Sequence, residues 1–147
     1  MNAYNFLLHA HSGFRYVVSI LLLLSIFLSF SGWLEKKPYV EANRRINLFT
    51  LISAHIQLLL GILLYFKSPY VEFNSDTMKD PELRYWTMEH VVMMIVAIII
   101  ITIGHSKSKK LVLPEAKHRI IALYYSAALI IIVLAILASH RPFLGMS

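Results

Sequence analysis

Histidines and arginines occur at the ends and in the middle of long apolar runs in this 147-residue chain. The stretch "LLHAHSGFRYVV", residues 7–18, carries His9, His11 and Arg15 at the mouth of one such run. Ionisable side chains are costly near hydrocarbon, and those found there tend to be functional. Neutral imidazole is the commonest metal ligand and a frequent axial ligand of haem iron, while a guanidinium binds carboxylates. What these groups can do depends on the elements that position them.

Composition and hydropathy place these groups on membrane-spanning helices. The chain is 58% hydrophobic with a mean hydropathy of +0.64, which is too apolar for a soluble domain of this length. Four apolar runs of about 20 residues are each long enough to cross a ~30 Å hydrocarbon core once. They predict helices over about 4–34, 46–66, 84–104 and 118–140. We therefore expect an all-α integral membrane protein, a single domain folded as an antiparallel four-helix transmembrane bundle.

The first run lacks the features of a cleaved signal peptide, so we interpret it as a retained helix. The chain has no cysteine, which excludes disulfides, thiolate ligands and covalently attached haem.

The distribution of charge predicts the orientation of the bundle. Nine of the fourteen basic residues fall in two connections, "EKKPYVEANRR" and "HSKSKKLVLPEAKHR". The positive-inside rule makes that side cytoplasmic and places both termini outside. The basic residues are expected to contact anionic lipid headgroups rather than nucleic acid.

Aromatic residues and prolines punctuate the expected helices. Interface positions are predicted for Trp33 on the inner side and for Tyr65, Phe66, Tyr85 and Trp86 on the outer side. All five prolines are expected in loops or beyond a helix end, at positions 38, 69, 81, 114 and 142.

Helical phase separates the seven histidines. At about 100° per residue, His11 shares a face with Val18, Leu22, Ser25, Ser29 and Gly32, and His90 shares one with Met93, Met94, Ala97, Ile101 and Gly104. Small and hydroxyl residues on membrane helices usually face neighbouring helices, which predicts that His11 and His90 point into the bundle. His55 and His140 are also expected to face inward, whereas His9 lies on the opposite face. His105 and His118 stand among lysines and are expected to be solvated interface residues.

One inward histidine on each helix predicts a cofactor site. Four-helix bundles build such sites from side chains on facing helices. Two of His11, His55, His90 and His140 would be the axial ligands of a single haem b, with Arg15 and Arg141 beside its propionates at the outer mouth.

The choice of ligands stays open at this point. Depth along the helices suggests two pairings, His11 with His140 and His55 with His90, whereas helical phase favours His11 and His90. Zinc suits the four residues less well because they differ in depth, and copper with a methionine remains an alternative. The histidines are also open to a role in packing alone.

Four segments carry a resemblance to a known family: "LLHAHSGFRY", "NLFTLISAHIQLLLGILLYF", "DPELRYWTMEHVVMM" and "ITIGHSKSKK". Together they resemble a family of small four-helix membrane proteins of Bacteroidetes that is labelled "cytochrome b", over nearly the whole chain. The resemblance implies a b-type haem and a redox role. The layout is more distantly similar to bacterial di-haem cytochromes b and to one half of haem A synthase. The fourth helix has no histidine at its middle, so one haem is expected rather than two.

The expected function is electron transfer by a membrane cytochrome in a bacterial inner membrane, alone or with a quinone or other membrane redox subunits. The sequence has no nucleophile motif, paired catalytic carboxylates or phosphate-binding glycine loop. Glu89, beside His90, is expected either to relay protons to a quinone or to form an interfacial hydrogen bond. The alternative function is a structural or assembly subunit without a cofactor.

Overall fold

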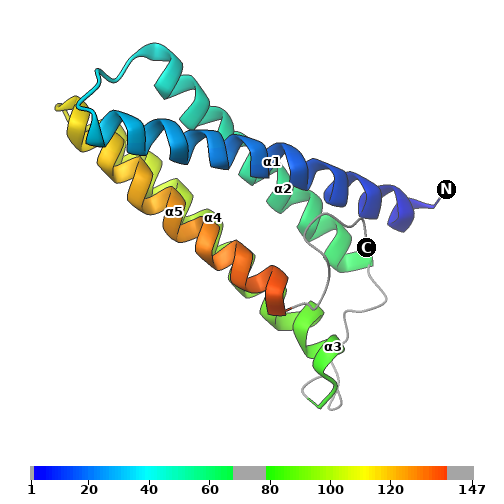
Figure 1. Cartoon of the computed structure of the whole chain (residues 1–147). Coiled ribbons are helices and arrows are strands. Elements are labelled where there is room, and N and C mark those ends of the chain that lie inside the picture. Colours follow the sequence, from blue (N-terminus) through cyan, green and yellow to red (C-terminus); the bar gives the residue numbers. More distant parts are fainter. Residues whose placement is uncertain (1, 68–78, 139–147) are drawn as a thin grey trace.

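The structure, a computed structural model, describes residues 2–67 and 79–138, and these residues are helical apart from short connections (Figure 1). Four long helices form the bundle: α1 (Ala3–Leu34), α2 (Glu41–Lys67), α4 (His90–Lys110) and α5 (Pro114–Ala138). A single turn, α3 (Pro81–Arg84), and a π-helical turn, η1 (Tyr85–Glu89), lead into α4. The four long helices are each long and apolar enough to cross a membrane. The prediction of an all-α chain with four such helices is therefore confirmed.

The four helices surround a common interior. Helix α1 packs against α2 and α5, α5 packs against α4, and α4 closes the ring against α2. Helices α1 and α4 are consequently diagonal to each other. Figure 1 shows α1 and α5 close together at the end with the two short connections and diverging toward the end where α1 begins. We call the end with the short connections the loop end and the other the open end.

Local capping explains how α1 begins and ends. The side chain of Asn2 caps its first turn by accepting a hydrogen bond of 2.8 Å from the backbone N–H of Asn5. At its other end Lys36 adopts a left-handed φ of 53°, and the N–H of Lys37 donates to the carbonyl of Gly32. This is the six-to-one hydrogen bond of a Schellman ending, with lysine where glycine is usual.

The predicted helix boundaries were wrong at the loop end. Helix α2 begins at Glu41 rather than near 46, α4 continues to Lys110 rather than 104, and α5 begins at Pro114 rather than near 118. Hydropathy marks where apolar surface ends, whereas the backbone hydrogen bonds continue through charged residues that favour helix. The prolines at 81 and 114 open α3 and α5 instead of lying in loops, because proline fits the first helical position.

The predicted inward faces of α1 and α4 are confirmed. On α1 the residues in phase with His11, which are Val18, Leu22, Ser25, Ser29 and Gly32, are all buried. On α4 the residues Ala97, Ile101 and Gly104, in phase with His90, are buried as well. The hydroxyls of Ser25 and Thr50 lie 2.8 Å apart and join α1 to α2. Small and hydroxyl residues let these helices approach closely and hydrogen-bond to each other.

The two histidines of the loop end are buried, so the prediction that they are solvated was wrong. His118 is 1% exposed and His105 is 3% exposed. A Cβ placed on Gly32 would lie 2.5 Å from the ring of His118, which shows how closely α1 crosses α5. The Nε2 atom of His118 lies 3.2 Å from the carbonyl of Pro38. His105 and His118 are buried because they lie on the inward faces of α4 and α5. The lysines near them in the sequence do not prevent this burial.

Candidate functional site

His11 and His90 meet in the interior at the open end of the bundle. Their ring centres are 6.4 Å apart and their planes lie at 81°. They come from α1 and α4, which are diagonal to each other, so the two side chains reach across the bundle. The structure therefore brings together the two histidines that helical phase had favoured, because the long α1 continues past the level of His90.

The separation of the two rings fits a pair of ligands on one metal. An imidazole nitrogen lies about 1.13 Å from its ring centre, if the ring bonds are taken as about 1.33 Å. A metal–imidazole bond is about 2.0–2.1 Å, as found at zinc. Two rings on opposite sides of one metal therefore have centres roughly 6.3–6.5 Å apart. The observed separation falls in this interval, and rotation about the metal–nitrogen bonds leaves the angle between the planes unconstrained.

A buried tyrosine fixes the proton on His90. The Tyr85 hydroxyl lies 2.7 Å from the carbonyl of Ala135, to which it donates, and 3.2 Å from Nδ1 of His90. Because the single hydroxyl proton points to the carbonyl, Nδ1 of His90 must be the donor to the Tyr85 oxygen. The lone pair of the neutral ring is then on Nε2, the nitrogen that such a histidine offers to a metal.

Helix α2 supports His11 from the side. The side-chain amide of Gln57 donates a hydrogen bond of 2.9 Å to the backbone carbonyl of His11. One turn further along α2, a Cβ on Gly61 would lie 3.2 Å from Cε1 of His11, so a side chain there would require the ring to move by a few tenths of an ångström. The Nδ1 atom of His11 is buried without a hydrogen-bond partner. A buried nitrogen of this kind needs a hydrogen-bond partner, a water or a metal.

Arg15 lies one helical turn beyond His11 and is partly buried. Its guanidinium is stacked 5.2 Å from the ring centre of Tyr16, and Nη2 lies 3.4 Å from the Tyr16 hydroxyl. A guanidinium at this position is suited to an anionic group bound beside His11.

His55 differs from its predicted role. The residue is exposed at the seam between α2 and α4, and its Nε2 lies 3.0 Å from the hydroxyl of Thr102. Thr102 is twelve residues from His90 on one helix, about 18 Å along its axis at 1.5 Å per residue. The predicted inward orientation of His55 was therefore wrong, and the pairing of His55 with His90 is not formed.

The remaining predicted site residues have simpler outcomes. His9 is exposed, as its phase predicted. His140 and Arg141 lie outside the described residues, so the pairing of His140 with His11 and the place of Arg141 beside the propionates stay predictions. Glu89 forms an ion pair with Arg84 at 2.9 Å, and its predicted place at the membrane interface stays a prediction. Among residues 2–67 and 79–138, three or more histidine or acidic side chains do not gather closely enough to hold a metal ion by themselves.

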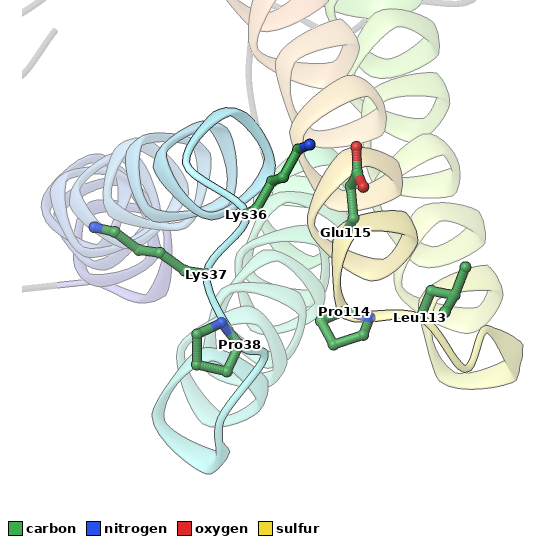
Figure 2. Close-up of a pocket in the computed structure, with 6 residues that line it drawn as sticks. All are labelled: Lys36, Lys37, Pro38, Leu113, Pro114 and Glu115. Atoms are coloured by element: carbon green, nitrogen blue, oxygen red, sulfur yellow. The ribbon is translucent and has the colours of Figure 1, made fainter.

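A cavity of about 420 Å³ lies at the opposite end of the bundle from the histidine pair (Figure 2). The residues that line it are Lys36, Lys37, Pro38, Leu113, Pro114 and Glu115. They come from the connection after α1, from the end of the connection between α4 and α5, and from the first residues of α5. This cavity is therefore separate from the His11–His90 site.

No protein-family model, curated protein or solved structure matches this chain. The geometry of the site accordingly carries the functional interpretation.

Three residues of the site were missed by sequence reasoning. Gln57 and Gly61 share a face of α2 with the buried Ala54. Their helical phase could therefore have predicted that they face the interior. Tyr85 was predicted at the membrane interface but is 5% exposed and points inward. In an α-helix residues five apart are separated by about 140° in phase, so the α-helical pattern placed Tyr85 away from His90.

Proposed function

We propose that this protein is a membrane cytochrome that binds one b-type haem through His11 and His90 and transfers electrons. The observation that carries the proposal is the 6.4 Å separation of the two ring centres across the bundle. Bis-imidazole ligation from facing helices is a common way in which helical bundles hold haem.

The surrounding residues fit such a cofactor. The buried Nδ1 of His11 lacks a partner, and the Tyr85 contact leaves the lone pair of His90 on Nε2. Arg15 stands one turn away, within reach of an anionic substituent. The four apolar helices supply walls that exclude water. Bound haem would provide a one-electron carrier, and the chain's own residues would orient it and set its potential.

The test is an absorption spectrum of the full chain, purified in detergent from cells supplied with haem. We expect a Soret band, with α and β bands that sharpen on reduction, and close to one haem per chain. His11→Ala and His90→Ala should each abolish most of the bound haem. His9→Ala is the matched control on α1, because His9 is exposed two residues away, and it should retain haem.

Two results would overturn the proposal. A colourless wild-type protein from haem-replete cells would favour a structural or assembly subunit. Haem retained in both the His11 and the His90 variants would move the ligands elsewhere, and His55 and His140 would then be substituted next.

A further inference from the structure

The π-helical turn η1 creates the contact between Tyr85 and His90. The backbone N–H of His90 donates to the carbonyl of Tyr85, five residues back, instead of closing an α-helical turn. Such an insertion widens the turn by one residue and is frequent at functional sites. It brings side chains five apart toward the same face, and the ring centres of Tyr85 and His90 lie 5.7 Å apart. A regular α-helix would have separated them.

Tyr85 also ties this turn to a second helix. Its hydroxyl donates to the carbonyl of Ala135 on α5, in the same buried position where it accepts from His90. A hydroxyl that donates a proton is a better acceptor, because hydrogen bonds in a chain polarise one another. The chain of contacts from His90 through Tyr85 to Ala135 therefore fixes both the ring orientation and the tautomer of His90.

We propose that Tyr85 is a positioning residue that holds His90 in the Nδ1–H tautomer and tunes its strength as a ligand. This inference rests on the proposed haem ligation for its redox consequence, but its tautomer consequence holds in the haem-free protein as well. A ligating histidine whose second nitrogen donates a hydrogen bond is oriented and made more basic by that bond. A more basic ligand stabilises ferric over ferrous iron, so Tyr85 would lower the reduction potential.

The first measurement uses the haem-free full chain in detergent, labelled with ¹⁵N-histidine. The ¹⁵N shifts of His90, assigned by their loss in His90→Gln, should show a protonated Nδ1 and an unprotonated Nε2. In Tyr85→Phe we expect the signal to shift toward the Nε2–H form, because Nδ1–H has lost its acceptor.

The second measurement is the reduction potential of the haem-loaded protein. Tyr85→Phe should make the potential more positive and should weaken haem binding by about tenfold, the lower part of the range for losing such a support. If all of that tenfold loss falls on the ferric form, the shift is about 59 mV for a one-electron couple.

Tyr125→Phe is the matched control. Tyr125 is fully buried, and its hydroxyl donates across the bundle to the carbonyl of Asn47 at 2.8 Å rather than to a histidine. A merely structural role for Tyr85 would make the two variants alike in stability, potential and His90 tautomer. We expect the potential and the tautomer to change in Tyr85→Phe only.

The outcomes separate this inference from the proposed function. A colourless wild-type protein contradicts haem binding, and the tautomer of His90 still tests Tyr85. A wild-type His90 in the Nε2–H form overturns the inference without any variant. A haem-binding protein whose potential and tautomer are unchanged in Tyr85→Phe overturns the inference alone.

Discussion

The two ends of the bundle use histidine in opposite ways. At the loop end His118 is 1% exposed, lies against Gly32 of α1 and has its Nε2 within 3.2 Å of the Pro38 carbonyl. At the open end His11 and His90 are only partly buried and face each other across the interior. The same residue type packs two helices together at one end and forms a facing pair at the other.

The neighbours of each histidine make the difference. The ring of His118 lies 5.1 Å from that of Tyr39 and directly against Gly32, where α1 and α5 cross closely. Burial raises the pKa of the Tyr39 hydroxyl, which accepts a hydrogen bond from Asn47 and stays neutral. The converging helices of the loop end leave room for one ring between them, whereas the diverging helices of the open end leave room for two facing rings. A histidine in a membrane bundle is thus better classified by the spacing of the helices around it than by its depth alone.

The largest expected effect is on stability at the loop end. His118→Ala should lower the free energy of unfolding by about 2–5 kcal/mol, the range for truncating a large buried side chain. Thermal unfolding in detergent measures this change. If the protein binds haem as proposed, the folded fraction of His118→Ala should keep the wild-type amount of haem per chain, in contrast to His11→Ala. A His118→Ala variant that loses haem but keeps its stability would contradict the packing role of His118.

The second effect concerns the close crossing of α1 and α5. Gly32→Ala places a methyl group 2.5 Å from Cε1 and Nε2 of His118, and we expect a loss of about 1–3 kcal/mol from overpacking. Gly13→Ala is the control on the same helix, because a Cβ there meets no atom within 4 Å. It should be neutral or stabilising by about 0.5–1 kcal/mol, since alanine favours helix over glycine. Equal melting temperatures for the two variants would contradict the tight crossing.

The smallest expected effect on stability lies at the open end. Gly61→Ala puts a Cβ 3.2 Å from Cε1 of His11, a contact that a few tenths of an ångström of ring movement relieves. The helical gain of alanine offsets part of that cost, so stability should stay within about 1 kcal/mol of wild type. The ¹⁵N shifts of His11 should nevertheless change, because the ring moves. Unchanged His11 signals would show that Gly61 does not confine this ring.

Hydropathy and helical phase determined most of the architecture. Four apolar runs predicted four long helices, because hydrocarbon requires each backbone segment to satisfy its own hydrogen bonds. The spacing of Val18, Leu22, Ser25 and Ser29 predicted the buried face of α1 and with it the inward direction of His11. Helix ends were predicted less well, because the backbone hydrogen bonds continue past the last apolar residue.

Only the tertiary structure decided which histidines meet. Depth counted from an assumed interface separated His11 from His90, whereas the packing of a 32-residue α1 across the bundle brings their rings to 6.4 Å. His55 is exposed and lies against Thr102. His118 is buried in the bundle, although its neighbours in the sequence include lysines. Tyr85 reaches His90 through a π-turn that breaks the regular phase. The sequence by itself determines which face of a helix is buried, since that depends on local periodicity. Contacts between the faces of different helices depend on the angles at which the helices cross and on their relative depth. They depend also on the one-residue insertion of the π-helical turn. These features are set only when all four helices pack together.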